Sequence, residues 1–254
     1  MSKLSFLLIA LMICLAAVSV AGAQDGVRVK CDRYTMNVPS INARCYQIDE
    51  NIPVGQDMAP ADPDAEEVIM ADISPEELAK AQIACTAIYF SDYDLLKSEI
   101  APQVTFYRVD DLGRTSFSLM DTGLRIFDIV NNINAGFISA DNVLDELPFL
   151  PYQAAAKTVN VLPEKLDFEN GSGIRTVTSF RDTLFSGAGN SNLYYSFQGI
   201  TADGNTYVSA VFPLESAVLN GRTAAGIDWS SVSSSDFRPG LDEMDFYIRS
   251  IVIE

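Results

Sequence analysis

The sequence of 254 residues contains no histidine. Histidine supplies the base of Ser-His-Asp and Cys-His catalysis, many ligands of zinc and copper, and the usual proton shuttle at neutral pH. Its absence excludes these classes of enzyme and metalloprotein. Since no other catalytic motif or ordered set of metal ligands stands out, the sequence predicts a protein without enzymatic activity, metal or cofactor.

Basic residues are also scarce. The chain has 17 lysines and arginines against 34 acids, a formal net charge of −17. Such a charge repels nucleic acid and anionic lipid surfaces. The composition therefore predicts that neither is a partner.

Residues 1–23 have the pattern of a secretory signal peptide. Lys3 precedes an apolar run from Leu4 to Val20, and Ala21-Gly22-Ala23 offers the small residues after which signal peptidase cleaves. No later segment approaches the roughly 18 uninterrupted apolar residues of a membrane helix. We expect a protein that is secreted or exposed in the periplasm or cell envelope, with no membrane span once the signal is cleaved.

The remaining chain divides by composition into two parts. Residues 24–73 combine short strand-like pieces with an acidic, proline-rich linker at 49–67, which predicts an N-terminal annex. Residues 74–254 form the main domain, and Ser74 is suited to cap a short helix at its start.

Three cysteines follow the signal peptide: Cys31, Cys45 and Cys85. In an oxidising compartment Cys31 and Cys45 could close a short loop and stabilise the annex, which would leave Cys85 as a buried thiol. Spacing alone does not define the pairing, so a bridge from either cysteine to Cys85 stays open.

Strand patterns dominate residues 158–214. Their breaks fall at Pro163-Glu164, at residues 171–173, at residues 186–190 and at Asp203-Gly204. Short breaks favour antiparallel pairing of consecutive strands, because parallel strands need a long crossover.

Helical spacing occurs in three places. The stretch before Gly136 places either Leu124, Phe127, Val130 and Ile133 or Ile126, Ile129 and Ile133 on one face, residues 139–147 repeat the pattern more briefly, and Leu241, Met244 and Ile248 form a terminal stripe. A short strand could follow that last helix, or residues 244–254 could be strand throughout. These patterns predict an α+β fold: an antiparallel meander with helices packed on it, like an α/β/α sandwich.

The most regular pattern surrounds Asp-Gly-Asn at residues 203–205. An even-numbered connection, either the Asp-Gly pair alone or residues 202–205, pairs Phe197 with Ala210 and places the large apolar side chains on one face. Asp-Gly suits a type I′ turn, in which both central residues have positive φ. We interpret the segment as a hairpin turn rather than a metal site.

The other face of this hairpin is half polar, with Tyr194, Gln198 and Tyr207 alternating with apolar residues. This composition fits a face that a helix covers in part. It also fits the wall of a ligand groove, in which the three side chains would form hydrogen bonds with the ligand. A bulge at Gln198-Gly199 would explain a glycine inside a strand.

Two further candidates lie nearby. The apolar loop "LPFLPYQ", with Phe149 and Tyr152, either covers the core or forms an interaction patch. Arg175 sits on a strand beside many acids, where a structural ion pair is expected and recognition of a substrate anion is the alternative.

Three stretches carry a resemblance: "LPFLPYQAA" (147–155), "DFENGSGIRTVTSF" (167–180) and "LYYSFQGITADGNTYVSAVFPL" (193–214). They resemble a group of bacterial secreted proteins and lipoproteins that share LPFLP, then F-x-N-G-S-G-x-R, then F-Q-G-L-T-x-D-G-x-Y-Y-V-x-A. The chain departs from the group's Asn-Ala-Ala-Gln at residues 153–156 and lacks the lipobox of its lipidated members. The resemblance implies a compartment and a fold but transfers no catalytic residue.

The order of elements is also similar to the α/β/α sandwich of the PsbP proteins of photosystem II, at the level of fold alone. Together the patterns predict a non-enzymatic binding or interaction protein that uses the sheet face and the apolar loop. Its partner would be another extracytoplasmic protein or a small ligand. The alternative is an extracellular hydrolase that depends on two carboxylates, such as Asp167 and Glu169 on one face of a strand.

Overall fold

The computed structural model describes residues 27–38, 43–48, 83–90, 93, 100–115, 117–151, 156–181, 192–219 and 226–254. The predicted signal peptide, the acidic linker, the helix expected at Ser74, the turn at 186–190 and Tyr152 lie outside these residues.

The described elements are strands, α-helices and short 3-10 helices (η). In chain order they are β1 (Val27–Cys31), β2 (Tyr34–Val38), β3 (Ala43–Ile48), β4 (Cys85–Phe90), β5 (Gln103–Arg108), α3 (Val109–Thr115), α4 (Phe117–Asn134), η1 (Ala140–Val143), β6 (Ala156–Phe168), β7 (Gly171–Arg181), β8 (Leu193–Thr201), β9 (Thr206–Ser216), η2 (Ala217–Leu219), η4 (Trp229–Ser231), η5 (Ser234–Asp236), β10 (Phe237–Arg238), α5 (Leu241–Arg249) and β11 (Val252–Ile253).

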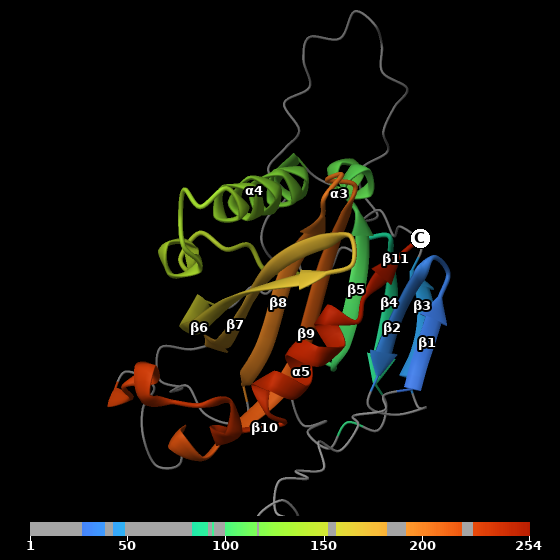
Figure 1. Ribbon diagram of the computed structural model, residues 1–254. Coiled ribbons are helices and arrows are strands. Elements are labelled where there is room, and N and C mark those ends of the chain that lie inside the picture. Colours follow the sequence, from blue (N-terminus) through green and yellow to red (C-terminus); the bar gives the residue numbers. More distant parts are fainter. Residues whose placement is uncertain are drawn as a thin grey trace, which may run out of the picture.

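The strands form two sheets (Figure 1). The larger has eight strands in the order β3-β4-β5-β9-β8-β7-β6, with β10 paired to β9, and the smaller has three in the order β1-β2-β11. Every pairing is antiparallel, and β6 to β9 follow one another as a meander. The predicted α+β class and the antiparallel meander are therefore confirmed.

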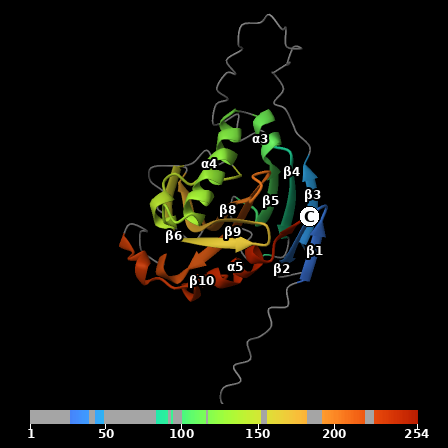
Figure 2. The same cartoon turned by 45° about the horizontal axis from the view of Figure 1, so that its top comes forward.

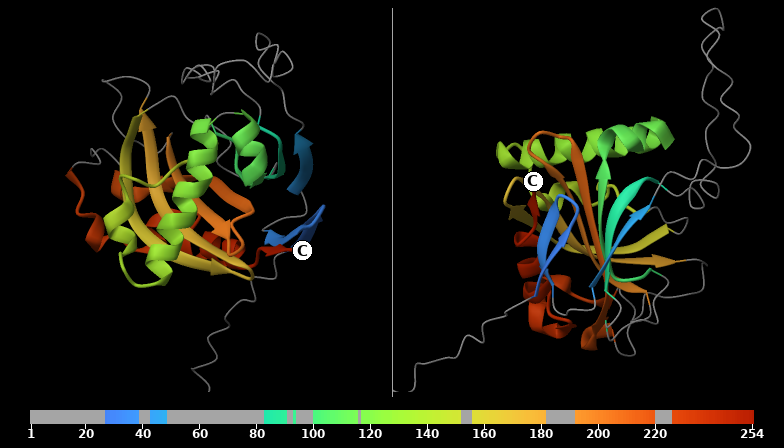
Figure 3. Two further views of the ribbon diagram at one scale, coloured as in Figure 1. Left: turned by 90° about the horizontal axis from the view of Figure 1, so that it is seen from above. Right: turned by 90° about the vertical axis from the view of Figure 1, so that its right-hand side faces the viewer.

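Helices cover both faces of the large sheet (Figures 2 and 3). In the left view of Figure 3, α4 crosses in front of the strands and α5 lies behind them. Tyr195 and Phe197 of β8 belong to the same core as Met244 of α5, whereas Ile200 shares its core with Ile126 of α4. Because neighbouring residues of a strand point to opposite faces, one strand contributes to both cores.

The buried face of α4 is the second of the two stripes that spacing allowed, together with Val130 of the first. Ile126 and Ile129 are buried, and Leu124 of the other stripe is 47% exposed. The helix ends before Gly136, which adopts a φ of +74° as glycine readily does. At residues 139–147, where a shorter α-helix was expected, one 3-10 turn forms instead.

The even register of the β8–β9 hairpin is confirmed, since Phe197 pairs with Ala210 and Tyr195 with Phe212. The connection is the four-residue one, because β8 ends at Thr201 and β9 begins at Thr206. The type I′ prediction is wrong, since in this turn only Gly204 has a positive φ, +75°. The four-residue loop here uses one such residue, whereas a two-residue type I′ loop needs two.

Two breaks predicted in the meander are wrong. β6 runs through Pro163-Glu164, where the register to β7 shifts between Val161 and Glu164 and forms a bulge. Proline is compatible with a bulge on an edge strand, which β6 is. The Gly171-Ser172-Gly173 segment is strand, and the turn lies at Glu169-Asn170.

The expected bulge at Gln198-Gly199 is also wrong, because the pairing with β7 is regular there and Gly199 faces Gly173. A Cβ on either glycine would lie 2.6 Å from the ring of Phe197. Glycine is needed at this pair because the ring occupies the space that two side chains would fill.

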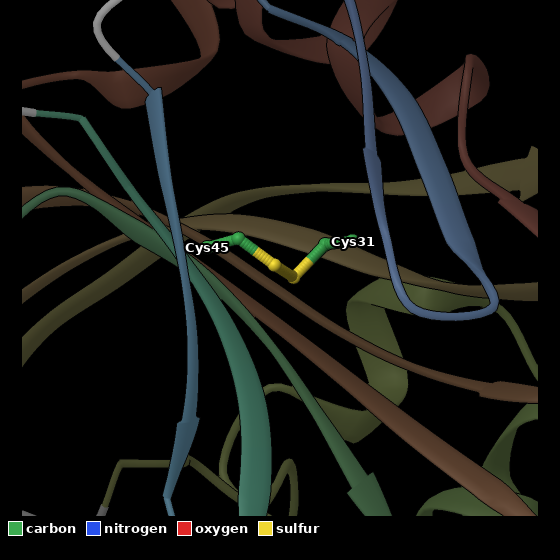
Figure 4. Close-up of a disulfide and its surroundings, with 2 residues drawn as sticks. All are labelled: Cys31 and Cys45. Atoms are coloured by element: carbon green, nitrogen blue, oxygen red, sulfur yellow. A yellow bond between two sulfur atoms is a disulfide. The ribbon is translucent and has the colours of Figure 1, made fainter.

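The strands expected in the N-terminal annex belong to both sheets. β3 pairs with β4 in the large sheet, while β1 and β2 join β11 from the other end of the chain. The Cys31–Cys45 disulfide, with Cα atoms 5.6 Å apart, links the two sheets (Figure 4). Of the pairings that spacing left open, this one is confirmed, and Cys85 is a free thiol. The prediction of a terminal helix followed by a short strand is confirmed as α5 and β11.

Candidate functional site

The half-polar sheet face that sequence suggested as a ligand groove is closed. Tyr194, Gln198 and Tyr207 are 1%, 0% and 0% exposed. A ligand from solvent reaches none of them in this conformation, so the covered-face alternative holds and the groove interpretation is corrected. Residues 147–150 cover a part of this face in addition to the part that α4 covers, so the cover is complete rather than partial.

The polar groups of that face satisfy one another. The Gln198 side chain accepts hydrogen bonds from the Leu150 amide (3.1 Å) and the Tyr207 hydroxyl (2.6 Å). Its amide nitrogen donates to the Leu150 carbonyl (3.2 Å) and to the hydroxyls of Ser196 and Ser209 (3.1 and 3.2 Å). Buried polar groups are stable only when paired in this way. The network therefore fastens the apolar loop to the sheet.

The apolar loop is core cover, as the first of its two interpretations predicted. Leu147 and Leu150 are buried, and the half-buried ring of Phe149 packs edge-on against Phe180 with centroids 4.6 Å apart. Tyr152 lies outside the described residues, so its part in this loop stays a prediction.

Arg175 forms the structural ion pair that was expected of it. It is 6% exposed, its guanidinium contacts Glu164, and its Nε lies 3.4 Å from Asp245 of α5. Nη1 also donates to the Leu162 carbonyl at 2.8 Å. Protein groups contact both Nη groups, and Nε is buried near Asp245 without a hydrogen-bond partner, so the guanidinium offers no exposed site to a substrate anion.

Asp245 completes this cluster below α5. Its carboxylate accepts a hydrogen bond from the Tyr195 hydroxyl at 2.8 Å. Burial raises the pKa of Asp245 above its ordinary value, although the charge of Arg175 opposes that shift. A raised carboxyl pKa can mark a general acid. Here the group is enclosed between sheet and helix, and its contacts are those of a clamp that holds α5.

Asp167 and Glu169, the pair offered as a hydrolase site, lie exposed at the edge of the sheet. Asp167 is exposed and contacts Lys165 on the same edge strand, and Glu169 lies exposed in the β6–β7 turn. The turn at residues 203–205 is likewise accounted for, because the Asp203 carboxylate accepts hydrogen bonds from the Asn205 amide (3.0 Å) and the Thr201 hydroxyl. These bonds lower the pKa of Asp203.

In the described part of the chain, no group of three or more histidine, cysteine, aspartate or glutamate residues could hold a metal ion. No helix within the same residues is long and apolar enough to cross a membrane.

A polar pocket of about 730 Å³ opens where the small sheet meets one end of the large one. We call it the junction pocket. Its lining residues are Asp32, Arg33, Tyr34, Ala84, Cys85, Thr86, Phe106, Arg108, Asp110, Asp111 and Asn205. Its volume lies within the range of about 300 to 1,000 Å³ that is typical of small-molecule sites.

The floor of the junction pocket belongs to the face of the large sheet that α5 covers, at a part of that face beyond the helix. Thr86 pairs directly with Phe106, and Arg108 lies two residues beyond Phe106, so the three side chains share one face. Thr206 of β9 pairs with Arg108. An arginine therefore replaces the apolar residues of β5 at the point where the core ends.

The opposite wall is the two-residue turn between β1 and β2. Cys31 pairs with Tyr34, which leaves Asp32 and Arg33 as the connection. Asp32 has a φ of +56°, a conformation that aspartate tolerates better than most residues. The Tyr34 ring stacks on Phe106 with centroids 4.0 Å apart and so fixes the turn above the sheet.

Arg33 is held by uncharged groups. Its Nη2 donates to the Thr206 hydroxyl at 2.6 Å, and its guanidinium carbon lies 5.3 Å from the centre of the Tyr34 ring. Arg108, with a side chain 65% exposed, approaches Asp111 at 3.9 Å. Charges of both signs therefore line one cavity.

Cys85 is not a reactive group of this pocket. Burial raises the pKa of its thiol to about 12, so the thiol stays protonated at neutral pH.

Sequence reasoning missed the junction pocket. Asp32 and Arg33 lie 75 residues or more before Arg108 and Asp110 in the chain, and no periodic pattern connects them. The available signal was the aspartate-arginine dipeptide between two strand-like pieces, which is typical of a turn. Comparisons of the chain with protein-family models, curated proteins and solved structures found no match.

Proposed function

We propose that this is an extracytoplasmic binding protein that holds a small ligand, or a protruding group of another protein, in the junction pocket. The observation that supports the proposal is a cavity of about 730 Å³ with charges of both signs, next to a cross-link between the two sheets that form it. Small-ligand sites are typically concave and largely pre-formed, with a few polar groups that fix the orientation of the ligand.

The proposed site differs from the one that sequence patterns suggested. The Tyr194 face and the loop at residues 147–151 are engaged with each other and serve the scaffold. The binding function is kept, and its location moves to the other face of the same sheet.

Secretion supports this function and remains part of the proposal. The leader pattern of residues 1–23 and the disulfide both suit an oxidising compartment. N-terminal sequencing of protein recovered from the medium or envelope should begin at Gln24. A mature protein that keeps the leader would contradict the predicted processing.

The pocket can be tested by affinity capture with matched variants. Immobilised full-length protein is exposed to the envelope and medium fractions of its own source, and the bound material is titrated to saturation. Arg33→Gln/Arg108→Gln should reduce saturable binding at least about tenfold, because charge-assisted hydrogen bonds contribute about 1.5–3 kcal/mol each. The control Arg28→Gln/Arg125→Gln removes the same charge at exposed positions outside the pocket and should bind like the wild type.

Equal capture by all three proteins would place the binding surface outside the junction pocket. No saturable capture by the wild type would contradict the binding function itself.

The hydrolase remains a second candidate because aspartates line the pocket from two elements, Asp32 on the β1–β2 turn and Asp110 on α3. A hydrolase of this type requires two carboxylates around the bond that is cleaved. It predicts that Asp32→Asn or Asp110→Asn abolishes turnover while ligand binding persists. The binding function predicts that the captured ligand is released chemically unchanged by the wild type.

A further inference from the structure

We infer that the junction pocket recognises a small zwitterion, namely a short peptide with a free amino and a free carboxyl terminus. This inference rests on the proposed binding function and assigns its ligand class. It follows from the way in which the pocket's two arginines and its aspartates are held.

The carboxylate would bind Arg33. Among the described residues the guanidinium of Arg33 forms no ion pair, and its contacts are a hydroxyl and an aromatic ring. An arginine has five N–H donors, and the bond to Thr206 uses one Nη group. A guanidinium positioned by uncharged partners keeps its charge and its remaining donors for a carboxylate, which it can bind in bidentate fashion.

Arg108 adds a second positive group from the floor. Its strand partner is Thr206, the residue to which Arg33 donates, so the two arginines approach the same strand end from the turn and from the sheet. The ion pair of Arg108 with Asp111 is long, 3.9 Å, and its side chain is largely exposed. Such a pair contributes little and is readily exchanged for a ligand carboxylate.

The ammonium group would bind the aspartates. Asp32 and Asp110 are exposed in the lining. Asp32 adjoins Arg33 in the β1–β2 turn, and Asp110, on α3, follows Arg108 of β5 by two residues. With two arginines and three aspartates the lining has a slight negative excess. This balance, in a chain of net charge −17, disfavours a polyanion such as a nucleotide and favours a ligand whose own charges cancel.

The remaining properties of the pocket agree with a peptide. The carboxylates do not form a metal cluster among the described residues. The volume of about 730 Å³ admits a ligand larger than a single amino acid. Tyr34 and Phe106 line the pocket but are buried, at 3% and 1% exposed, so its charged and polar side chains provide the surface that a peptide would contact.

Isothermal titration calorimetry of the full-length protein tests the ligand class with four probes. These are trialanine with free termini, N-acetyl-trialanine, trialanine amide and the neutral trisaccharide maltotriose. Trialanine should bind saturably, and blocking either terminus should weaken its binding at least about tenfold, the loss expected for one charge-assisted hydrogen bond.

Two variants assign the termini to residues. Arg33→Gln should reduce the preference for free trialanine over its amide several-fold, with Arg108 retaining a part, while keeping the preference over the acetylated peptide. Asp32→Asn should reduce the preference over the acetylated peptide, with Asp110 retaining a part, while keeping the preference over the amide. Arg28→Gln, exposed and outside the lining, should keep both preferences, and circular dichroism should show that all variants are folded.

Equal affinity for trialanine and its two blocked forms would overturn the inference. Binding of maltotriose without binding of any peptide would also overturn it, while the proposed binding function would stand. If none of the probes binds but capture from the native fractions still depends on Arg33 and Arg108, the zwitterion inference fails and the proposed binding function stands. If that capture is lost as well, both proposals fail.

Discussion

Arg175 and Arg33 contact the same face of the large sheet at two different ends, and their surroundings are opposite. Arg175 is buried below α5 and contacts two carboxylates, Glu164 and Asp245. Arg33 is half-buried at the small sheet and contacts a hydroxyl and a ring. An arginine neutralised by protein carboxylates stabilises the fold, whereas one held by uncharged groups keeps its charge for a ligand.

The difference follows from what covers each end. The apolar stripe of α5, with Met244 and Ile248, closes the face around Arg175. The small sheet closes the other end only as far as the Tyr34–Phe106 stack, beyond which the junction pocket begins. Cover by a continuous helix excludes water, and cover by a two-residue turn leaves a cavity beside it.

The largest effect on stability is expected at Arg175, where α5 covers the sheet. Arg175→Met leaves Asp245 buried without its cation and should lower the free energy of unfolding by about 3–5 kcal/mol. Urea denaturation measures this change. The double variant Arg175→Met/Asp245→Leu should recover much of the loss, because it removes the uncompensated charge as well. A loss below about 1 kcal/mol for the single variant would mean that the cluster is not a clamp.

The uncharged hydrogen-bond network around Gln198, on the opposite face of the sheet, should contribute less to stability. Gln198→Ala removes the partners of the Leu150 amide and the Tyr207 hydroxyl and leaves a cavity, at a cost of about 2–4 kcal/mol in unfolding free energy. Affinity capture by the folded variant should match that of the wild type. Loss of capture at unchanged stability would restore the groove interpretation of this face.

The pH dependence of stability separates Asp245 from the surface acids. Burial raises the pKa of Asp245 in the folded protein above the ordinary 3.8. Its contribution to the free energy of unfolding is therefore complete below about pH 3.8 and is lost as the pH rises through the raised value. Asp203 and Asp236, whose pKa values hydrogen bonds lower, act in the opposite direction.

Asp245→Asn removes the first contribution and keeps the other two. The free energy of unfolding of the wild type, minus that of the variant, should fall as the pH rises from 3.8 toward neutrality. Urea titrations of both proteins across this interval give the difference directly. A difference that is constant with pH would show that folding does not raise the pKa of Asp245.

The smallest effect on stability is expected at the open end. Arg33→Gln removes one hydrogen bond to the buried Thr206 hydroxyl and a contact with the Tyr34 ring but leaves no carboxylate without its cation, so the free energy of unfolding should fall by only about 1 kcal/mol. Chemical denaturation beside the binding measurement provides the check. A loss approaching that of Arg175→Met would mean that Arg33 is structural and would remove the contrast on which the ligand assignment depends.

Much of the fold follows from local patterns. The alternation of β8 and β9 defines their register, because a shift of one residue would mix Phe197 and Tyr195 with polar neighbours. The stripe with Met244 and Ile248 likewise defines α5. The breaks at Pro163 and at Gly171 were misplaced because a bulge and an aromatic ring from a neighbouring strand, rather than the local sequence, determine the conformation there.

The sequence by itself determined the α+β class, the antiparallel order, the hairpin register and the absence of histidine chemistry, since each depends on residues close together in the chain or on composition. Only the tertiary structure decided which polar side chains are buried and which line a pocket that solvent can reach. A loop covers Gln198 and a helix covers Arg175. Arg33 and Arg108, which are 75 positions apart in the chain, line the same pocket. Burial and cavities depend on how distant segments pack, and the periodicity of one segment does not contain that information.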